Sequence, residues 1–124
     1  MSIGVRDIDR SKRFYDAALE PLGYRCVRAA RTATGYGYGA KTIAFWVMFA
    51  EHPIVPDEKS GLHVCFAAPS AAAVEAFHAA ALRSGGRDNG RPGPRALYAP
   101  DYYAAFVIDP DGYRIEAYFG PGEM

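Results

Sequence analysis

Two short apolar stretches in the second half of the chain carry side chains that bind metal ions or move protons. In the stretch 62–67, the alternation of an extended chain puts His63 and Cys65 on one face and apolar residues on the other. In the stretch 113–119, Glu116 lies between apolar neighbours. A carboxylate in such a place is costly to bury unless it is paired or bound to a metal. From residue type alone, a solvated glutamate and a hydrogen-bonded strand histidine are the commoner arrangement.

Composition sets the broad class of the protein. The chain has 124 residues, of which 50% are hydrophobic, and its 14 basic residues balance 14 acidic ones, so no net field draws it to nucleic acid or anionic lipid. No apolar run approaches the roughly 20 residues that span a bilayer, and the first ten residues lack the pattern of a signal peptide. Cys26 and Cys65 form no paired motif. We therefore expect one folded, reduced, cytoplasmic domain that binds neither nucleic acid nor membrane.

The sequence contains an internal repeat, in which the second copy follows the first at an offset of 63 residues. At this offset two residues that can cap a helix start, Asp7 and Ser70, fall on each other. The other matched pairs are Phe14 with Phe77, Ala17 with Ala80, Ala18 with Ala81, Leu19 with Leu82 and Gly23 with Gly86. A duplicated half-domain builds a site between its copies, so equivalent positions can be compared within one sequence.

Hydrophobic periodicity predicts the same order of elements in each half, β-α-β-β-β, and therefore an α+β fold. The first half is expected to contain a strand at 2–6, a helix at 8–22 and strands at 24–30, 35–40 and 42–49. A proline-containing linker follows at 51–59. The second half is expected to contain a strand at 62–67, a helix at 70–84, a partly extended stretch at 87–100, and strands at 102–108 and 113–119. Residues 109–112, Asp-Pro-Asp-Gly, predict a type I turn between the last two strands.

The first helix, DIDRSKRFYDAALEPLGY, and the ending, YYAAFVIDPDGYRIEAYF, resemble the vicinal oxygen chelate superfamily. This superfamily includes glyoxalase I, the bleomycin- and fosfomycin-resistance proteins and the extradiol dioxygenases. The resemblance implies two βαβββ modules that form a barrel-like cup, the glyoxalase/bleomycin-resistance fold. Residues 1–124 would form one domain, with module one at about 1–50, a linker at 51–60 and module two at about 61–124. It also implies a homodimer.

The resemblance implies a divalent metal held by ligands from the first strand of each module and the last strand of the second. Those positions fall on His63 and Glu116, and Glu116 would also be the catalytic residue that shuttles a proton. The third family ligand is missing, because its histidine would fall one residue before Met1, and Ala44 is the expected counterpart of Glu116 in the first half. An overlooked upstream start that supplies this histidine is one hypothesis for the gap.

A substrate cavity is expected beside these ligands, lined by Trp46, Met48, Cys65, Tyr103, Arg114 and Tyr118. Its rim would carry Tyr98 and Tyr102, with Arg91 and Arg95 in the preceding loop. Cys65 has three readings: a soft metal ligand, a thiol nucleophile, or, as buried cysteines usually are, a small packing residue.

Two functions remain open. The first is a glyoxalase-like metalloenzyme with lyase or dioxygenase chemistry on a small substrate that has vicinal oxygens. The alternative is a metal-free protein that binds a small molecule or drug through the aromatic cavity alone. The ligands His63 and Glu116 favour the first function, and the missing histidine favours the second.

Overall fold

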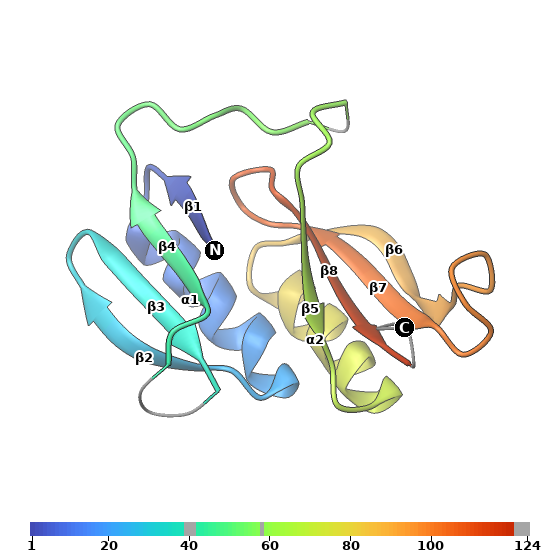
Figure 1. Ribbon diagram of the computed structural model, residues 1–124. Helices are drawn as coiled ribbons and strands as arrows, with labels where there is room; N and C mark the ends of the chain where they lie inside the picture. Colours follow the sequence, from blue (N-terminus) through green and yellow to red (C-terminus); the bar gives the residue numbers. More distant parts are fainter. Residues whose placement is uncertain (39–41, 58, 121–124) are drawn as a thin grey trace.

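Two modules of the same design make up the protein (Figure 1). Its structure is a computed structural model that describes residues 1–38, 42–57 and 59–120. The first comprises β1 (Ser2–Val5), α1 (Ile8–Leu19), a 3₁₀ turn (Glu20–Leu22), β2 (Arg25–Ala30), β3 (Ala33–Gly37) and β4 (Phe45–Phe49). The second comprises β5 (His63–Ala67), α2 (Ala71–Arg83), β6 (Arg87–Pro94), β7 (Tyr103–Ile108) and β8 (Arg114–Phe119). The predicted α+β class and the repeated βαβββ order are confirmed.

The two helices begin in the same way, as the repeat predicts. The side chain of Asp7 accepts a hydrogen bond from the backbone N–H of Arg10 at 3.0 Å. The side chain of Ser70 accepts one from the N–H of Ala73, also at 3.0 Å. Each cap satisfies a backbone donor that the first turn of a helix leaves without a partner.

Each module folds its strands into a four-stranded sheet with the same order. The orders are β1-β4-β3-β2 and β5-β8-β7-β6. In both sheets the first and last strands of the module are parallel neighbours, whereas the other neighbours are antiparallel. This topology brings β5 directly beside β8, although about fifty residues of chain separate them.

The helices lie together and the sheets flank them (Figure 1). Each helix covers one face of its own sheet, and α1 also packs against α2. The shared core contains the fully buried rings of Phe14, Tyr15, Phe45 and Phe77. We call the face of each sheet opposite its helix the open face. Because the helices pack against each other, no helix in the described part of the chain lies on either open face.

The Asp-Pro-Asp-Gly turn joins the two modules through a buried carboxylate. The Gly112 N–H donates to the Asp109 carbonyl at 3.0 Å, as a type I turn requires. One Asp109 carboxylate oxygen accepts the hydroxyl of Tyr15 from α1 at 2.5 Å, and the other accepts two backbone N–H groups of the turn. Burial outweighs these hydrogen bonds and raises the pKa of Asp109 to about 6.

Three strands differ from their expected bounds by more than one residue. β3 covers Ala33–Gly37 rather than 35–40, and residues 39 and 40 of that prediction lie outside the described residues, as does residue 58 of the expected linker. β4 begins only at Phe45, so 42–44 is not strand. β6 extends through Pro94 in spite of its glycines and prolines, with irregular pairing that accommodates them. Arg91 is therefore a strand residue rather than a loop residue.

None of the helices in the described ranges combines the length and apolar character that crossing a membrane requires.

Candidate functional site

The parallel pairing of β5 with β8 brings the predicted ligands together on the open face of the second sheet. In this register Cys65 lies opposite Glu116, and His63 lies opposite Arg114. Strand alternation then turns Val64 and Phe66 toward the helix, where both are buried, and leaves His63 and Cys65 exposed. For these four residues of β5, the side-chain orientations expected from the sequence are those observed.

Glu116 is the centre of the cluster. The residue is only 3% exposed, whereas the side chain of His63 above it is 42% exposed. The Nε2 atom of His63 lies 3.1 Å from Glu116 Oε1, and the thiol of Cys65 donates to the same oxygen at 3.1 Å. The ligand atoms of these three residues lie within 4.8 Å of one another. We call His63, Cys65 and Glu116 the ligand cluster.

Tyr102 binds the other oxygen of this carboxylate. Its hydroxyl donates to Glu116 Oε2 at 2.5 Å. The loop between β6 and β7 holds Tyr102 in place, because the Arg95 N–H donates to the Tyr102 carbonyl and the Tyr102 N–H donates to the Ala99 carbonyl. The sequence placed Tyr102 only at the rim. The expected strand 102–108 begins at Tyr102, but the observed strand begins at Tyr103, and the preceding loop positions the Tyr102 hydroxyl at Glu116.

Aromatic rings form a wall beside the ligand cluster. The rings of Tyr102 and Tyr118 stack with centroids 5.4 Å apart, and Tyr98 meets Tyr102 edge-on at 5.2 Å. On the other side, the imidazole of His63 stacks on Phe106 at 6.0 Å, and the guanidinium of Arg95 lies 5.3 Å from the centre of that ring. Flat apolar surfaces next to a few polar groups suit a small organic ligand.

The thiol of Cys65 is not an activated nucleophile in this setting. Partial burial of the sulfur, followed by the hydrogen bond to Glu116 and its negative charge, raises the pKa of Cys65 to about 12. Nucleophilic cysteines instead have a lowered pKa. Burial and the same carboxylate also raise the pKa of Tyr102. Both groups therefore keep their protons and donate them in hydrogen bonds to Glu116.

Tyr103 lies apart from the ligand cluster. It is on the helix side of β7, and its hydroxyl donates to Glu75 of α2 at 2.7 Å. With Tyr102 and Phe119 it lines a separate hollow of about 430 Å³.

Trp46 and Met48 also lie away from the cluster, on β4 of the first sheet. β1 pairs with β4 so that Ser2 lies opposite Trp46, in the way that Cys65 lies opposite Glu116. Since the 63-residue offset relates Ser2 to Cys65, the counterpart of Glu116 is Trp46 and not Ala44, which was expected. The expected counterpart was placed two residues too early in the sequence, because β4 starts later than the apolar run 42–49 from which it was placed.

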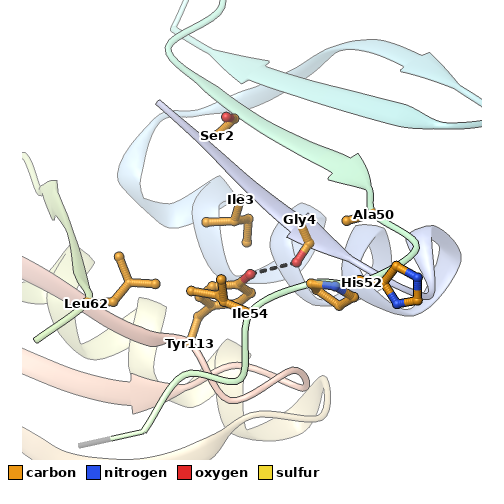
Figure 2. A pocket seen from close by; sticks show the side chains of 9 residues that line it. Ser2, Ile3, Gly4, Ala50, His52, Ile54, Leu62 and Tyr113 are labelled. Carbon is orange, nitrogen blue, oxygen red and sulfur yellow. Dashed lines mark hydrogen bonds between the residues drawn. The ribbon is translucent and has the colours of Figure 1, made fainter. Parts of the chain in front are cut away.

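A further hollow of about 400 Å³ lies between β1 and the linker (Figure 2). Figure 2 shows Ile3, Ile54 and Leu62 gathered around Tyr113, whose hydroxyl donates to the Gly4 carbonyl at 2.6 Å. The lining of this hollow is mainly apolar and includes no residue of the ligand cluster. We therefore place the candidate site at the ligand cluster, where the donor groups converge.

The residues of the ligand cluster suit a divalent metal ion. They offer one imidazole nitrogen, one sulfur and a carboxylate, which is a donor set typical of zinc and related transition metals. The buried carboxylate supplies the negative charge that such an ion needs. His63, Cys65 and Glu116 are thus the residues that could hold it.

Comparison with known proteins places the chain in a family. The sequence model of the Glyoxalase/Bleomycin resistance protein/Dioxygenase superfamily matches residues 1–117. The chain belongs to this superfamily. A search of curated proteins finds no match.

Solved structures agree with this assignment. A glyoxalase/bleomycin resistance protein from Albidiferax ferrireducens T118 is 34% identical, with a TM-score of 0.81 over 97% of this chain and 95% of that one. The fosfomycin resistance protein FosX from Mesorhizobium loti is 22% identical, with a TM-score of 0.68 over 97% and 88%. A glyoxalase-related enzyme from Fulvimarina pelagi is 16% identical, with a TM-score of 0.73 over 98% and 86%. The last two show likeness of fold alone. Superfamily membership supports a role in binding or converting a small molecule.

Proposed function

We propose that this protein is a metal-dependent enzyme that acts on a small substrate with vicinal oxygens at the open face of the second sheet. His63 and Glu116 are the proposed metal ligands, and Glu116 is also the proposed catalytic residue. The observation that carries the proposal is the buried Glu116 carboxylate, which receives His63, Cys65 and Tyr102 on its two oxygens. Lyase and dioxygenase chemistry both fit this arrangement.

Each side chain has a defined task in this proposal. Glu116 holds negative charge and accepts a proton, and the Tyr102 hydroxyl orients its second oxygen. His63 is open to solvent on one side, so a substrate can approach it. A divalent ion bound here would act as a Lewis acid that stabilises negative charge on substrate oxygens.

The aromatic wall is the proposed substrate surface. The stacked rings of Tyr102 and Tyr118 present apolar area next to the ligand cluster, and Arg95 adds a positive charge beyond Phe106. A planar ligand can stack on these rings while its oxygens reach the cluster. Arg114 lies opposite His63 in the register and is proposed to contact the same ligand.

We also propose that two chains assemble into a homodimer that encloses this site. The helices pack against each other inside one chain, so the open faces of both sheets are available to a second copy. β4 exposes Met48 and Phe49 as well. Trp46 and Met48 would then face the ligand cluster of the partner. Light scattering should give twice the single-chain mass of 13.5 kDa. A mass of one chain at micromolar concentration would contradict the dimer.

Calorimetric titration with Zn²⁺ tests the metal site. We expect one ion per chain for the natural protein. His63→Ala and Glu116→Gln should each weaken binding by at least about 100-fold, because losing a ligand costs more than losing an outer partner. His52→Ala and Glu20→Gln are matched controls outside the cluster and should bind as the natural protein does. Equal binding by all variants would exclude this metal site.

The alternative function is a metal-free binding protein. It is favoured by one observation, that Glu116 already has hydrogen-bond partners on both oxygens without an ion. A catechol, used as the vicinal-oxygen probe, distinguishes the two functions. The metalloenzyme should bind it more tightly with Zn²⁺ than with a chelator. Equal binding in both conditions would support the metal-free protein.

A further inference from the structure

We infer that Cys65 is the third protein ligand of the metal site, so that one module alone supplies a His-Cys-Glu set. This inference rests on the proposed function, which names only His63 and Glu116 as ligands. It assigns to Cys65 a role that the family resemblance does not give to any residue at this position. The first observation behind it is that all three ligand atoms lie within 4.8 Å of one another.

The backbone fixes this arrangement. His63 and Cys65 are two residues apart on one strand, so both side chains leave the same face of β5. The pairing of β5 with β8 puts Glu116 directly opposite Cys65. Neither contact depends on a loop, and strands position ligands more accurately than loops do.

Two of the three distances between ligand atoms are close to those of a tetrahedral site. Zinc binds sulfur at about 2.3 Å and nitrogen or oxygen at about 2.1 Å, which separates neighbouring ligand atoms by about 3.4 to 3.6 Å. Here His63 Nε2 and Cys65 Sγ each lie 3.1 Å from the same atom, Glu116 Oε1. These two separations are a few tenths of an ångström shorter than in a tetrahedral site, and all three ligand atoms lie within 4.8 Å of one another, so small side-chain rotations would bring them around one ion. The thiol would release its proton to solvent, and the thiolate sulfur would donate an electron pair to the ion.

The second cysteine of the chain provides an internal comparison. The sulfur of Cys26 contacts the Arg28 carbonyl and the Thr34 hydroxyl, and neither is a histidine or a carboxylate. Cys65 instead directs its sulfur at a buried carboxylate that also meets a histidine. Both cysteines are exposed residues, so the difference between them is in what each sulfur contacts. A thiolate ligand predicts preference for Zn²⁺ and Co²⁺ over Mg²⁺ and Mn²⁺.

Titration with Co²⁺ under reducing, oxygen-free conditions tests this inference, because a cobalt–thiolate bond gives a near-ultraviolet charge-transfer band. The natural protein and Cys26→Ser should develop this band and saturate at one Co²⁺ per chain. Cys65→Ser should lose the band and bind Co²⁺ at least about 10-fold more weakly. Circular dichroism checks that both variants are folded. If Cys65→Ser does not fold, X-ray absorption of the natural zinc-loaded protein replaces it and should show one sulfur at about 2.3 Å.

Each other outcome has a definite meaning. Co²⁺ binding without the band, or a band that persists in Cys65→Ser, would overturn the sulfur ligand and leave the His63–Glu116 site intact. A zinc spectrum with nitrogen and oxygen neighbours alone would do the same. Failure of the natural protein to bind either ion would overturn both this inference and the metal-dependent function.

Discussion

The two modules share one strand pairing but place different chemistry on it. In the first sheet, the pair on the open face is Ser2 with Trp46, and in the second it is Cys65 with Glu116. Trp46 packs over Gly35, where an added Cβ would lie 3.1 Å from the indole ring. The first sheet therefore offers an aromatic surface, and the second offers the donor groups of the ligand cluster.

This difference separates what the fold requires from what the function requires. Both modules keep the helix caps, the strand order and the buried phenylalanines Phe14 and Phe77, because each must cover its sheet with a helix. The open faces are free of that requirement and have diverged. Function in this family is carried by residues placed on a common scaffold.

Leucines at equivalent positions give the largest expected difference between the modules. Leu19 is fully buried, whereas its repeat partner Leu82 is 40% exposed. Leu19→Ala should lower the free energy of unfolding by about 3 kcal/mol, through lost burial and a cavity. Leu82→Ala should cost less than about 1 kcal/mol. Urea denaturation followed by circular dichroism measures both. Equal losses would show that the modules bury this position alike.

Asp109 and Asp88 each form a hydrogen bond with a helix residue at equivalent positions of the repeat. Their contributions to the stability of the protein should change in opposite directions with pH. Tyr15 bonds the buried Asp109, and its repeat partner His78 bonds the exposed Asp88. The pKa of Asp109 is raised to about 6, so its contribution to stability is present below about pH 4 and is lost as pH rises through 6. Between about pH 4 and pH 7 the natural protein should lose about 2 to 3 kcal/mol relative to Asp109→Asn.

Asp88 supplies the matched comparison. A backbone hydrogen bond from Gly90, followed by the one with His78, lowers the pKa of Asp88. Its contribution to stability is therefore present at neutral pH and is lost as pH falls through the lowered value. Relative to Asp88→Asn, the natural protein should lose a smaller amount on acidification, because this side chain is exposed. Unfolding curves give the stability of the natural protein relative to each Asn variant. If acidification changes both relative stabilities in the same direction, the assigned pKa shifts of Asp109 and Asp88 are wrong.

The fold was largely predictable because it depends on periodic, local signals. Alternation at 62–67 and 113–119, the caps at Asp7 and Ser70, and the Asp-Pro-Asp-Gly turn all act over a few residues. The proximity of His63 to Glu116 followed from alternation together with the family resemblance.

Other parts of the site depend on contacts that no local pattern specifies. Tyr102 reaches Glu116 because a loop turns it inward, whereas Tyr103, the next residue, faces α2. The match of Trp46 to Glu116 depends on the register of β1 with β4, which the apolar run 42–49 does not fix. The ligand roles of His63 and Glu116 stay predictions.

A tyrosine in each module gives the smallest expected effect. Tyr102→Phe keeps the stacked ring but removes the hydrogen bond to Glu116, so Zn²⁺ affinity should fall by about 10-fold. Tyr38→Phe makes the same change at an exposed residue of the first module and should leave the affinity unchanged. Calorimetry measures both variants. An unchanged affinity for Tyr102→Phe would remove this hydroxyl from the site.

Anomalous diffraction from zinc-soaked crystals tests the central claim most directly, because it locates the ion without any substitution. We predict one zinc peak per chain, within bonding distance of His63 Nε2 and the Glu116 carboxylate on the open face of the second sheet. No separate zinc ion is expected beside Ser2 and Trp46. A peak there should be the ion held by the ligand cluster of the partner chain in the proposed dimer. A zinc peak elsewhere, or none at the ligand cluster at a concentration that saturates binding in solution, would contradict the claim that this module holds the metal.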